Sequence, residues 1–249
     1  SVLVFTEAGH PDIFYRMWDA GLGECDVWYN EGSDPAGPIL HSKLKDMINR
    51  GINASAGMLI LNPDARSTYI GMRNSSFSRG SVHYVGNEIR AVILSKMHLA
   101  QGDTVCVISG ESIAVESAIL ACEGTVIAVE YSQGDRTTME ENVRQFGLNN
   151  ISIIDHVDDE TLAALPAPSL AFLVASASME QELACLLRRN PHMEFLIYTL
   201  DFRCAATLPA LFERLGIGET EVVQLSVSKL TAKGTFQTEP APWLISGRS

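Results

Sequence analysis

The stretch from residue 105 to residue 130 constrains the fold of this chain more than any other part of the sequence. It begins with an apolar run, residues 105–108, and continues with a small polar turn, residues 109–112. A helix-like run over 113–122 follows, and a second apolar run then ends on the acid Glu130. This order of strand, tight loop, helix and strand is typical of an adenosine-type cofactor site, in which the loop faces the middle of the cofactor and the acid accepts hydrogen bonds from the ribose hydroxyls.

The loop of this pattern is poor in glycine. A dinucleotide-binding fingerprint carries two or three glycines, which let the backbone approach a ligand closely. Here Gly110 is the only glycine of residues 109–112. It either permits approach to a ligand or serves as an ordinary turn glycine. The sequence therefore predicts the geometry of an adenosine-type site with part of its usual chemistry missing.

Composition and charge narrow the classes of function. The chain has 249 residues, of which 46% are hydrophobic and 19% charged, as in a folded protein with one or two cores. With 18 basic and 30 acidic residues, the net charge is −12. This charge disfavours nucleic-acid binding as a main role, because phosphate contacts need clustered Lys and Arg. No apolar run reaches the length of a membrane span, so we expect no membrane partner.

The cysteines and histidines give no support for a metal site. The five cysteines are widely spaced without a CxxC pair, and the six histidines lack an HxxxH spacing. We therefore expect no metal, and we expect the cysteines to be small buried hydrophobic residues in a reducing compartment. A cytoplasmic protein is the expectation that follows.

Hydrophobic periodicity predicts two α/β blocks joined by a polar, glycine-bearing segment over residues 65–86. In the first block we expect three strands and two helices. The strands are predicted at 2–6, 26–30 and 57–62, and the helices at 11–20 and 42–49.

The second block alternates strands and helices regularly, which predicts a doubly wound parallel sheet with ligands at the carboxyl ends of its strands. Two final apolar alternations predict an antiparallel edge, which is typical of Rossmann-like methyltransferase sheets rather than of dehydrogenases. Helices are expected at 88–98, 113–122, 137–146, 161–165, 179–189 and 205–215, strands at 105–108, 125–130, 151–154, 170–175 and 195–200, and the closing pair at 221–228 and 243–245.

Four motifs of the second block occur in a specific order. They are Ser78-Arg79-Gly80 before Asn87-Glu88-Ile89-Arg90-Ala91, the run 94–99 before Gly102-Asp103, Ile127-Ala128-Val129-Glu130, and the run 141–150. Together they resemble a known family, the decarboxylating precorrin-6Y C5,15-methyltransferases of cobalamin biosynthesis. The closing residues 244–248 fit as well. The resemblance implies that residues 67–249 form an S-adenosylmethionine-dependent methyltransferase-like domain that acts on a precorrin-type tetrapyrrole and assembles as a homo-oligomer.

The first block, residues 1–66, resembles the C-terminal lobe of a tetrapyrrole methylase domain. The matching landmarks are Thr6-Glu7, His10-Pro11, the run 20–23, the run 30–32 and Leu61-Asn62. That family also needs an N-terminal lobe, so this block is not expected to form a complete methylase active site.

The resemblance also implies which residues hold the cofactor, and several depart from the family pattern. The family loop resembles DxGxGTG, whereas this chain has Val107-Ile108-Ser109-Gly110-Glu111, and the acid of the adenine side falls on Val157, one step before Asp158. Glu111 would lie near the methionine carboxylate, where like charges cost affinity. The implied cofactor-binding residues are Ser109, Gly110, Glu111, Ser112, Glu130, Tyr131, Val157 and Asp158.

Arginines and serines are the candidates for substrate binding. Precorrins carry many carboxylates, and the guanidinium groups of Arg79 and Arg90 can bind carboxylates in a bidentate way. Arg90 is equally well explained as one partner of a helix-surface ion pair. Ser176 and Ser178 follow a strand end, where they either contact substrate or cap the next helix.

Two hypotheses of different classes remain open at the level of the sequence. The first is an enzyme that methylates a precorrin with loss of carbon dioxide; an electron-rich macrocycle carbon needs no general base, and none is assigned. The second is a degenerate methyltransferase fold that serves as a non-catalytic tetrapyrrole-binding or scaffold module. The reduced loop, Glu111 and Val157 favour the second, whereas Glu130 and the intact surrounding pattern favour the first.

Overall fold

The computed structural model describes residues 1–5, 12–30, 34, 36–48, 57–63, 70–80 and 85–249. The chain divides into two compact units, Ser1–Ser67 and Thr68–Ser249, and each is considered by itself. The tetrapyrrole-methylase landmarks at Thr6-Glu7 and His10-Pro11 lie outside the described residues, as does most of the run 30–32.

The described residues of the first unit form an antiparallel sheet with one covered face. Its strands have the order β1-β4-β2-β3, and each neighbouring pair is antiparallel. Side chains of β2 alternate, with Val27 and Tyr29 buried, because successive residues of a strand point to opposite faces. The elements are β1 (Val2–Phe5), α1 (Asp12–Met17), η1 (Trp18–Leu22), β2 (Asp26–Asn30), β3 (Ile39–Lys43), η2 (Leu44–Asp46) and β4 (Gly57–Leu61).

The helix predicted at residues 42–49 is wrong. Residues 39–43 instead pair along the whole of β2, and the chain then makes only the short turn η2. The charged run after Leu44 favours a helix locally, but Leu44 and Met47 are fully buried in the core of the unit, and the strand pairing decides the conformation.

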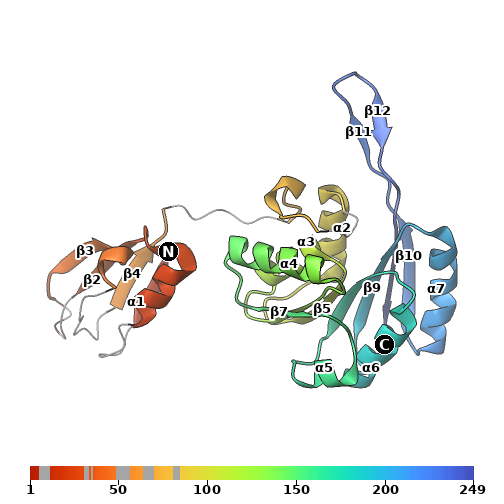
Figure 1. The fold of residues 1–249 in the computed structure, drawn as a ribbon, viewed down its shortest axis with the longest axis horizontal. Coiled ribbons are helices and arrows are strands. Elements are labelled where there is room, and N and C mark those ends of the chain that lie inside the picture. Colours follow the sequence, from red (N-terminus) through yellow and green to blue (C-terminus); the bar gives the residue numbers. More distant parts are fainter. Residues whose placement is uncertain (6–11, 31–33, 35, 49–56, 64–69, 81–84) are drawn as a thin grey trace. The chain divides into compact units, whose positions relative to one another are not determined.

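The second unit has a mostly parallel sheet in the order β10-β13-β9-β8-β5-β6-β7 (Figure 1). The strands from β7 to β9 are parallel, whereas β13 runs antiparallel to β9, and β10 antiparallel to β13. The predicted doubly wound sheet with an antiparallel C-terminal edge is confirmed. Its elements are η3 (Asn74–Ser76), α2 (Asn87–Met97), β5 (Thr104–Ile108), α3 (Glu111–Leu120), β6 (Thr125–Val129), α4 (Gln133–Phe146), β7 (Ile151–Ile154), α5 (Asp159–Ala163), β8 (Leu170–Val174), α6 (Met179–Arg189), β9 (Glu194–Thr199), α7 (Phe202–Arg214), β10 (Gly218–Gln224), β11 (Ser228–Leu230), β12 (Phe236–Thr238) and β13 (Trp243–Arg248).

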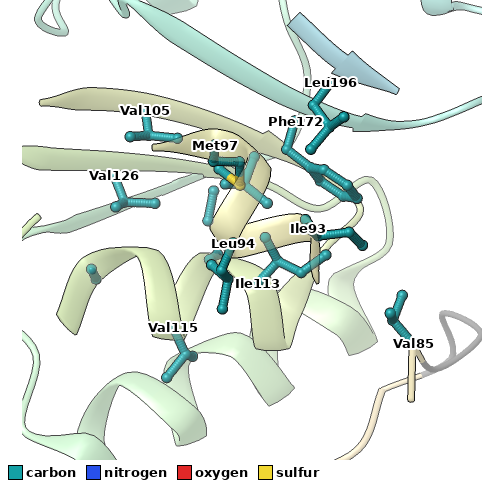
Figure 2. Close-up of a cluster of buried hydrophobic side chains, with 14 of the residues drawn as sticks. Val85, Ile93, Leu94, Met97, Val105, Ile113, Val115, Val126, Phe172 and Leu196 are labelled. Carbon is teal, nitrogen blue, oxygen red and sulfur yellow. The ribbon is translucent and has the colours of Figure 1, made fainter. Parts of the chain in front are cut away.

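Both faces of this sheet are covered, which explains why its strands read as unbroken apolar runs. On β5, Val105 and Val107 face the core beneath α2, α3 and α4, while Cys106 and Ile108 face the core beneath α5, α6 and α7. Figure 2 shows the first of these cores, where Phe172 is completely buried. Burial of such a side chain stabilises the fold by about 2–3 kcal/mol. A sheet that is covered on both faces buries apolar side chains on every strand.

Side-chain caps fix where several helices begin. The hydroxyl of Ser132 accepts the backbone N–H of Asp135 at 3.1 Å, so α4 begins four residues before the predicted start at 137. Asp201 accepts the N–H of Arg203 at 2.8 Å and starts α7 in the same way. Such caps satisfy N–H groups that the first helical turn leaves without partners.

The segment before α2 is not a simple linker. Met72, Phe77 and Val85 are buried in the core of the second unit. The side chain of Asn142 on α4 makes two hydrogen bonds to the backbone of Ser78. It accepts from the N–H at 2.8 Å and donates to the carbonyl at 3.1 Å. No hydrophobic periodicity indicates this packing, because the buried residues Met72, Phe77 and Val85 are irregularly spaced.

A two-stranded ribbon, β11 with β12, projects from the antiparallel edge (Figure 1). Leu230 and Phe236 lie opposite each other on it and are exposed. Near its base, the ammonium of Lys229 forms ion pairs with Glu88 at 2.9 Å and with Glu239 at 2.8 Å. The ribbon is therefore tied to the start of α2.

Three of the cysteines, Cys25, Cys106 and Cys185, are buried as expected, while Cys122 is exposed; none of the five forms a disulfide. In the described part of the chain, no helix is both long and apolar enough to cross a membrane.

Candidate functional site

The carboxyl ends of the parallel strands bring most of the predicted site residues to one edge of the sheet. The N–H of Ser109, after β5, donates to the carbonyl of Val129 at 3.0 Å, and the N–H of Glu130, after β6, donates to Ile154 at 3.0 Å. The loops after β5 and β6 are thus held side by side. Ser176 follows β8, the next strand on the other side of β5.

The loop after β5 turns sharply at Ser109 and packs tightly at Gly110. Ser109 has a φ of 57°, a left-handed conformation that few non-glycine residues adopt. A Cβ atom on Gly110 would lie 2.8 Å from Val107 Cγ1 and 3.2 Å from Phe172 Cε1. Gly110 therefore allows the loop to press against the buried side chains of β5 and β8.

Glu111, the first residue of α3, points its carboxylate at the segment before α2. The N–H of Gly80 donates to Glu111 Oε2 at 3.3 Å, whereas Glu111 Oε1 is buried and has no hydrogen-bond partner among the described residues. A Cβ on Gly80 would lie 1.9 Å from Glu111 Oε1 and 2.7 Å from Asp135 Oδ1. Two carboxylates therefore converge on one glycine. Burial raises the pKa of Glu111 to about 7, the Gly80 N–H opposes the rise and the charge of Asp135 adds to it.

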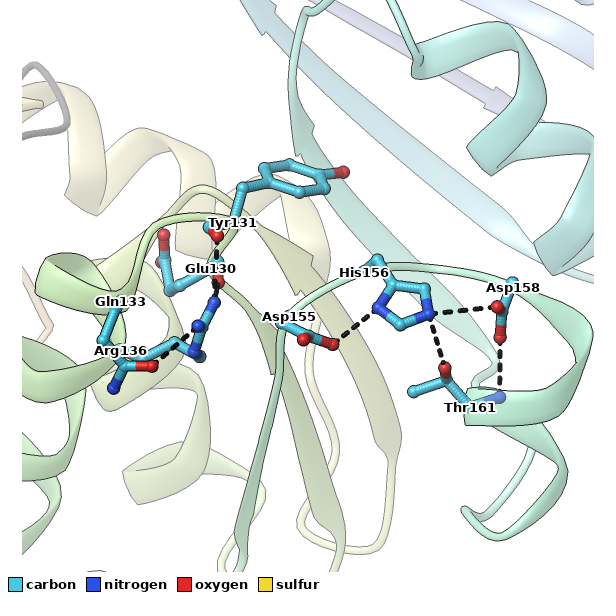
Figure 3. Close-up of polar contacts among 8 residues, drawn as sticks. All are labelled: Glu130, Tyr131, Gln133, Arg136, Asp155, His156, Asp158 and Thr161. Carbon is cyan, nitrogen blue, oxygen red and sulfur yellow. Dashed lines mark hydrogen bonds and ion pairs between the residues drawn. The ribbon is translucent and has the colours of Figure 1, made fainter.

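Glu130 is the acid at the tip of β6, and its side chain is only 1% exposed. Burial raises its pKa to about 8, with further contributions from the charges of Glu111 and Asp135, while a hydrogen bond from the Gly110 N–H lowers it. Oxygen Oε1 has no partner among the described residues. Arg136 donates to the carbonyls of Glu130 at 2.8 Å and Tyr131 at 2.9 Å, so it fixes the backbone of this corner rather than neutralising the carboxylate (Figure 3).

Tyr131, Ser176 and Ser178 are brought together by a residue that the sequence did not point to, Glu182 on α6. The Tyr131 hydroxyl donates to Glu182 Oε1, and Ser178 Oγ donates to the same oxygen at 2.6 Å. Ser176 Oγ lies 3.0 Å from Ser178 Oγ. Burial, followed by the contact with Glu182, raises the pKa of Tyr131. The side chain of Ser178 does not cap α6. The four-residue spacing between Ser178 and Glu182 is the sequence feature that could have predicted their contact.

Val157 and Asp158 lie after β7, the strand next to β6. Val157 is half-buried against the core beneath α5 to α7. Asp158 accepts the N–H of Thr161 at 2.7 Å and starts α5, and its other oxygen lies 3.0 Å from His156 Nε2. His156 also contacts Asp155 at 2.5 Å (Figure 3). Asp158 thus takes part in a local acidic turn with Asp155 and His156.

The structure corrects the expectation that Arg90 binds substrate. Its side chain is fully buried, and its Nε donates to Glu116 Oε1 at 2.5 Å. The remaining guanidinium N–H groups donate to Asn74 at 2.8 Å, to the carbonyls of Val85 and Met72, and to the Ser112 hydroxyl. All three nitrogens of the guanidinium therefore donate hydrogen bonds within the fold.

Ser112 belongs to the Arg90 network, since its hydroxyl accepts from Arg90 at 3.3 Å. Arg79, by contrast, is exposed and borders a small cavity of about 40 Å³ together with Gly80 and the loop 109–113. Arg79 therefore lies at the surface beside this cavity, whereas Arg90 is enclosed within the fold.

A larger cavity of about 760 Å³ lies at the carboxyl ends of β5, β8 and β9. Residues of α2 and the residues after β12, Glu239 and Pro240, line its other side. Its described lining includes two acids and no Lys or Arg. Representative lining residues are Ile89, Ser109, Ser176, Tyr198, Asp201 and Glu239. Ser109 borders both cavities, so they meet at the loop after β5.

Within the part of the chain that the structure describes, no group of three or more His, Cys, Asp or Glu residues is arranged to hold a metal ion. The converging carboxylates of Glu111, Glu130 and Asp135 are not such a group.

Residues 82–242 match the model of the precorrin methyltransferase domain, and this match spans more than half of the chain. The chain belongs to the precorrin methyltransferase domain family. The resemblance drawn from the motifs at 78–150 is confirmed at this level. Family membership makes methyl transfer from S-adenosylmethionine in cobalamin biosynthesis the class of activity of this methyltransferase domain. No curated protein matches the chain.

Solved structures support the fold. A precorrin-6Y C5,15-methyltransferase from Geobacter metallireducens GS-15 is 21% identical, with a TM-score of 0.66 over 72% of this chain and 96% of that chain. A precorrin 8W decarboxylase from Methanobacterium thermoautotrophicum is 17% identical, with a TM-score of 0.62 over 71% and 98%. An S-adenosylmethionine-dependent O-methyltransferase from Thermotoga maritima is 13% identical, with a TM-score of 0.56 over 91% and 93%. At these identities the likeness shows a Rossmann-like methyltransferase fold.

Proposed function

We propose that the second unit transfers a methyl group from S-adenosylmethionine to a carbon of a precorrin-type tetrapyrrole, coupled to decarboxylation of an acetate side chain. The observation that carries this proposal is the cavity of about 760 Å³ at the carboxyl ends of β5, β8 and β9. It meets the loop after β5 that lies beside Glu130. Open α/β sheets bind their ligands at this edge.

The residues present fit the adenosine part of the cofactor. Glu130 is buried, and its oxygen Oε1 has no partner among the described residues, so it can accept a ribose hydroxyl without first losing another bond. We assign Ser109 and Gly110 to the middle of the cofactor, and Tyr131, Val157 and Asp158 to its adenine side. Glu111 does not fit the carboxylate of the methionine arm while it is ionised.

The larger cavity suits the body of a macrocycle better than its charged side chains. Ile89, Val174 and Tyr198 give it apolar walls, and its ionisable lining residues are Asp201 and Glu239. Carboxylates of a precorrin would be repelled from these acids. We therefore place the substrate carboxylates that the reaction retains at the rim, where Arg79 and Arg203 are the candidate cations, and the hydroxyl of Ser176 on the wall.

The proposed methyl transfer requires the reacting atoms to be positioned and does not require a general base. The macrocycle carbon would supply the electron pair for the new bond to the methyl group, while the methyl–sulfur bond breaks and its electron pair stays on the leaving thioether. The protein holds the two reacting atoms in line and away from water. In the decarboxylation, the bond between the acetate methylene and its carboxylate breaks, carbon dioxide leaves, and the methylene takes up a proton. An apolar cavity lined by acids disfavours the ionised acetate and so favours its loss.

The first unit extends the proposal to the whole chain. We propose that residues 1–66 are the C-terminal lobe of a tetrapyrrole methylase domain, on the strength of the landmarks at 20–23 and 61–62. We also propose a homo-oligomer, with the exposed pair Leu230 and Phe236 on the ribbon as the candidate contact. Light scattering of wild type and of Phe236→Ser tests the second point, since loss of the contact lowers the mass.

Calorimetric titration with S-adenosylhomocysteine tests the cofactor assignment. We expect binding that is weakened at least tenfold in Glu130→Ala and unchanged in Glu123→Ala, because Glu123 is an exposed acid just before β6, at the opposite end of that strand from Glu130. Saturating ligand at about 100 times its dissociation constant should also add roughly 2.7 kcal/mol to the free energy of unfolding. Equal affinities of the two variants would contradict the role of Glu130.

A further inference from the structure

The first turn of α3 differs from an ordinary anion-binding helix start. The free N–H groups of such a turn normally favour a ligand's negative group. Here the chain supplies its own carboxylate, because Glu111 is the first residue of the helix and is directed at Gly80. A ligand carboxylate that approached this turn would meet Glu111 before it met the helix.

The neighbours of Glu111 deepen the negative character of the site. Asp135 comes from α4, with an oxygen beside the same Gly80, and Glu130 comes from the end of β6. Arg79 borders the small cavity with an exposed side chain, and Arg90 is committed to Glu116 and its other partners. Among the described residues, the charges that act most on Glu111 and Glu130 are therefore those of neighbouring carboxylates.

Two oxygens in this group are left without partners. Glu111 Oε1 and Glu130 Oε1 are both buried and accept no hydrogen bond from any described residue. Glu130 is 1% exposed, so water does not compensate for the missing donor. Buried acceptors without donors cost stability, and a ligand that brings N–H, O–H or cationic groups relieves that cost.

We propose that Glu111 sets the charge specificity of the adenosyl site. The site favours an adenosyl ligand whose arm is cationic and carries no carboxylate, and a ligand carboxylate binds there only together with one proton taken up from solvent. This inference rests on the proposed adenosyl site. The small cavity of about 40 Å³ at the Glu111 side chain agrees with it, because the arm must share this space with the carboxylate or displace it.

Proton uptake at neutral pH is compatible with the electrostatics of the site. Burial holds the pKa of Glu111 near 7 and that of Glu130 near 8; the charge of Asp135 raises both pKa values, and that of Glu111 raises the pKa of Glu130 further. A protonated Glu111 becomes a donor and can hydrogen-bond a ligand carboxylate that its ionised form repels. The titration belongs to the group of acids rather than to one residue.

Calorimetry with three ligands on the full chain tests the inference. S-adenosylhomocysteine carries an ammonium and a carboxylate, S-adenosyl-3-thiopropylamine carries the ammonium alone, and 5′-methylthioadenosine carries neither. At pH 8.5 we expect the thiopropylamine to bind at least tenfold more tightly than S-adenosylhomocysteine. Titrations in buffers of different ionisation enthalpy should show uptake of about one proton with S-adenosylhomocysteine and none with the other two.

Glu111→Gln is the matched variant, because it keeps the size of the side chain and removes its charge. It should bind S-adenosylhomocysteine at least tenfold more tightly than wild type at pH 8.5, without proton uptake, and should cancel the preference for the amine. Binding of 5′-methylthioadenosine should change less than twofold, which reports that the pocket is intact. Wild type alone supplies a second measurement, since its affinity for S-adenosylhomocysteine should fall about tenfold per pH unit above pH 8.

The outcomes separate the inference from the function beneath it. Equal wild-type affinities for S-adenosylhomocysteine and the thiopropylamine, or an unchanged ratio in Glu111→Gln, would overturn the role of Glu111 while leaving the adenosyl site in place. If 5′-methylthioadenosine and both charged ligands fail to bind at millimolar concentration, the adenosyl site itself is wrong and the inference is rejected with it.

Discussion

Arg90 and Glu116 form a buried ion pair in which Nε and Oε1 are 2.5 Å apart and both side chains are at most 2% exposed. Glu116 also accepts from the N–H groups of Gly71 at 2.6 Å and Met72 at 3.1 Å. The pair therefore joins α2, α3 and the segment before α2, and it supports the loop after β5 through Ser112.

Removing one partner of this pair should destabilise the second unit strongly. Arg90→Met leaves Glu116 as a buried charge without its cation, and we expect a loss of about 3–5 kcal/mol in the free energy of unfolding. Arg90→Met combined with Glu116→Leu should recover part of the loss. Denaturant unfolding measures both, with Arg144→Met as a control, because Arg144 belongs to an exposed pair. A loss in Arg90→Met no larger than in the control would show that the pair is not structural.

Glu130 should make the protein less stable as pH rises. Its pKa is about 8 in the folded protein against 4.5 for the ordinary group, so the folded state holds the proton more tightly. Its contribution is complete below pH 4.5 and is lost as pH rises through 8. Glu130→Gln should therefore be more stable than wild type by about 2 kcal/mol or more at pH 9 and nearly equal to it at pH 4. Thermal unfolding across this range checks the sign, with the exposed Glu123→Gln showing no such trend.

Gly110 and Gly134 should respond to alanine in opposite directions. The Cβ of Gly110→Ala would lie 2.8 Å from Val107 and 3.2 Å from Phe172, both fully buried, so we expect a loss of about 1–3 kcal/mol. Gly134 lies in α4, where the Cβ meets nothing closer than 3.9 Å, and alanine there should gain about 0.5–1 kcal/mol from helix propensity. Urea unfolding of the two variants gives the comparison, and a loss in both would point to a shared cause other than packing at the loop.

Tyr131 and Ser178 should be energetically coupled through the Glu182 oxygen that both contact. Tyr131→Phe and Ser178→Ala each remove one donor to the same carboxylate oxygen. Each should cost about 1–3 kcal/mol, and the double variant should cost more than the sum, because Glu182 is then buried without a donor from either side chain. A double-mutant cycle in denaturant measures this. Strict additivity would mean that another donor replaces them.

The alternation of the second unit could be predicted because its strands are buried on both faces and its helices have one apolar side. The strand at 151–154 and the helix at 179–189 agree with the structure residue for residue. The site residues that lie at strand ends, Ser109 and Glu130 among them, follow from the same alternation. Strand ends are defined by local apolar runs, so the sequence alone locates them.

The parts that could not be predicted depend on contacts between residues distant in the sequence. Arg90 lies 26 residues from Glu116, and nothing in the helix pattern distinguishes this buried pair from a surface one. Glu182 sits on an amphipathic helix at a position that could equally be solvated. The strand at 39–43 forms because β2 pairs with it, not because of its own propensity. In each case, a partner residue that is distant in the sequence determines the local structure.

The way the segment before α2 is anchored sets where the second unit can be cut. The family match begins at residue 82, yet Met72 and Phe77 are core residues. A fragment that started at residue 82 would lose both, would deprive Glu116 of two backbone donors, and would leave Arg90 without Asn74 and the Met72 carbonyl. The smallest fragment that keeps these contacts therefore begins at or before Ile70. This start lies close to the unit boundary at Thr68 and well before residue 82, where the family match begins.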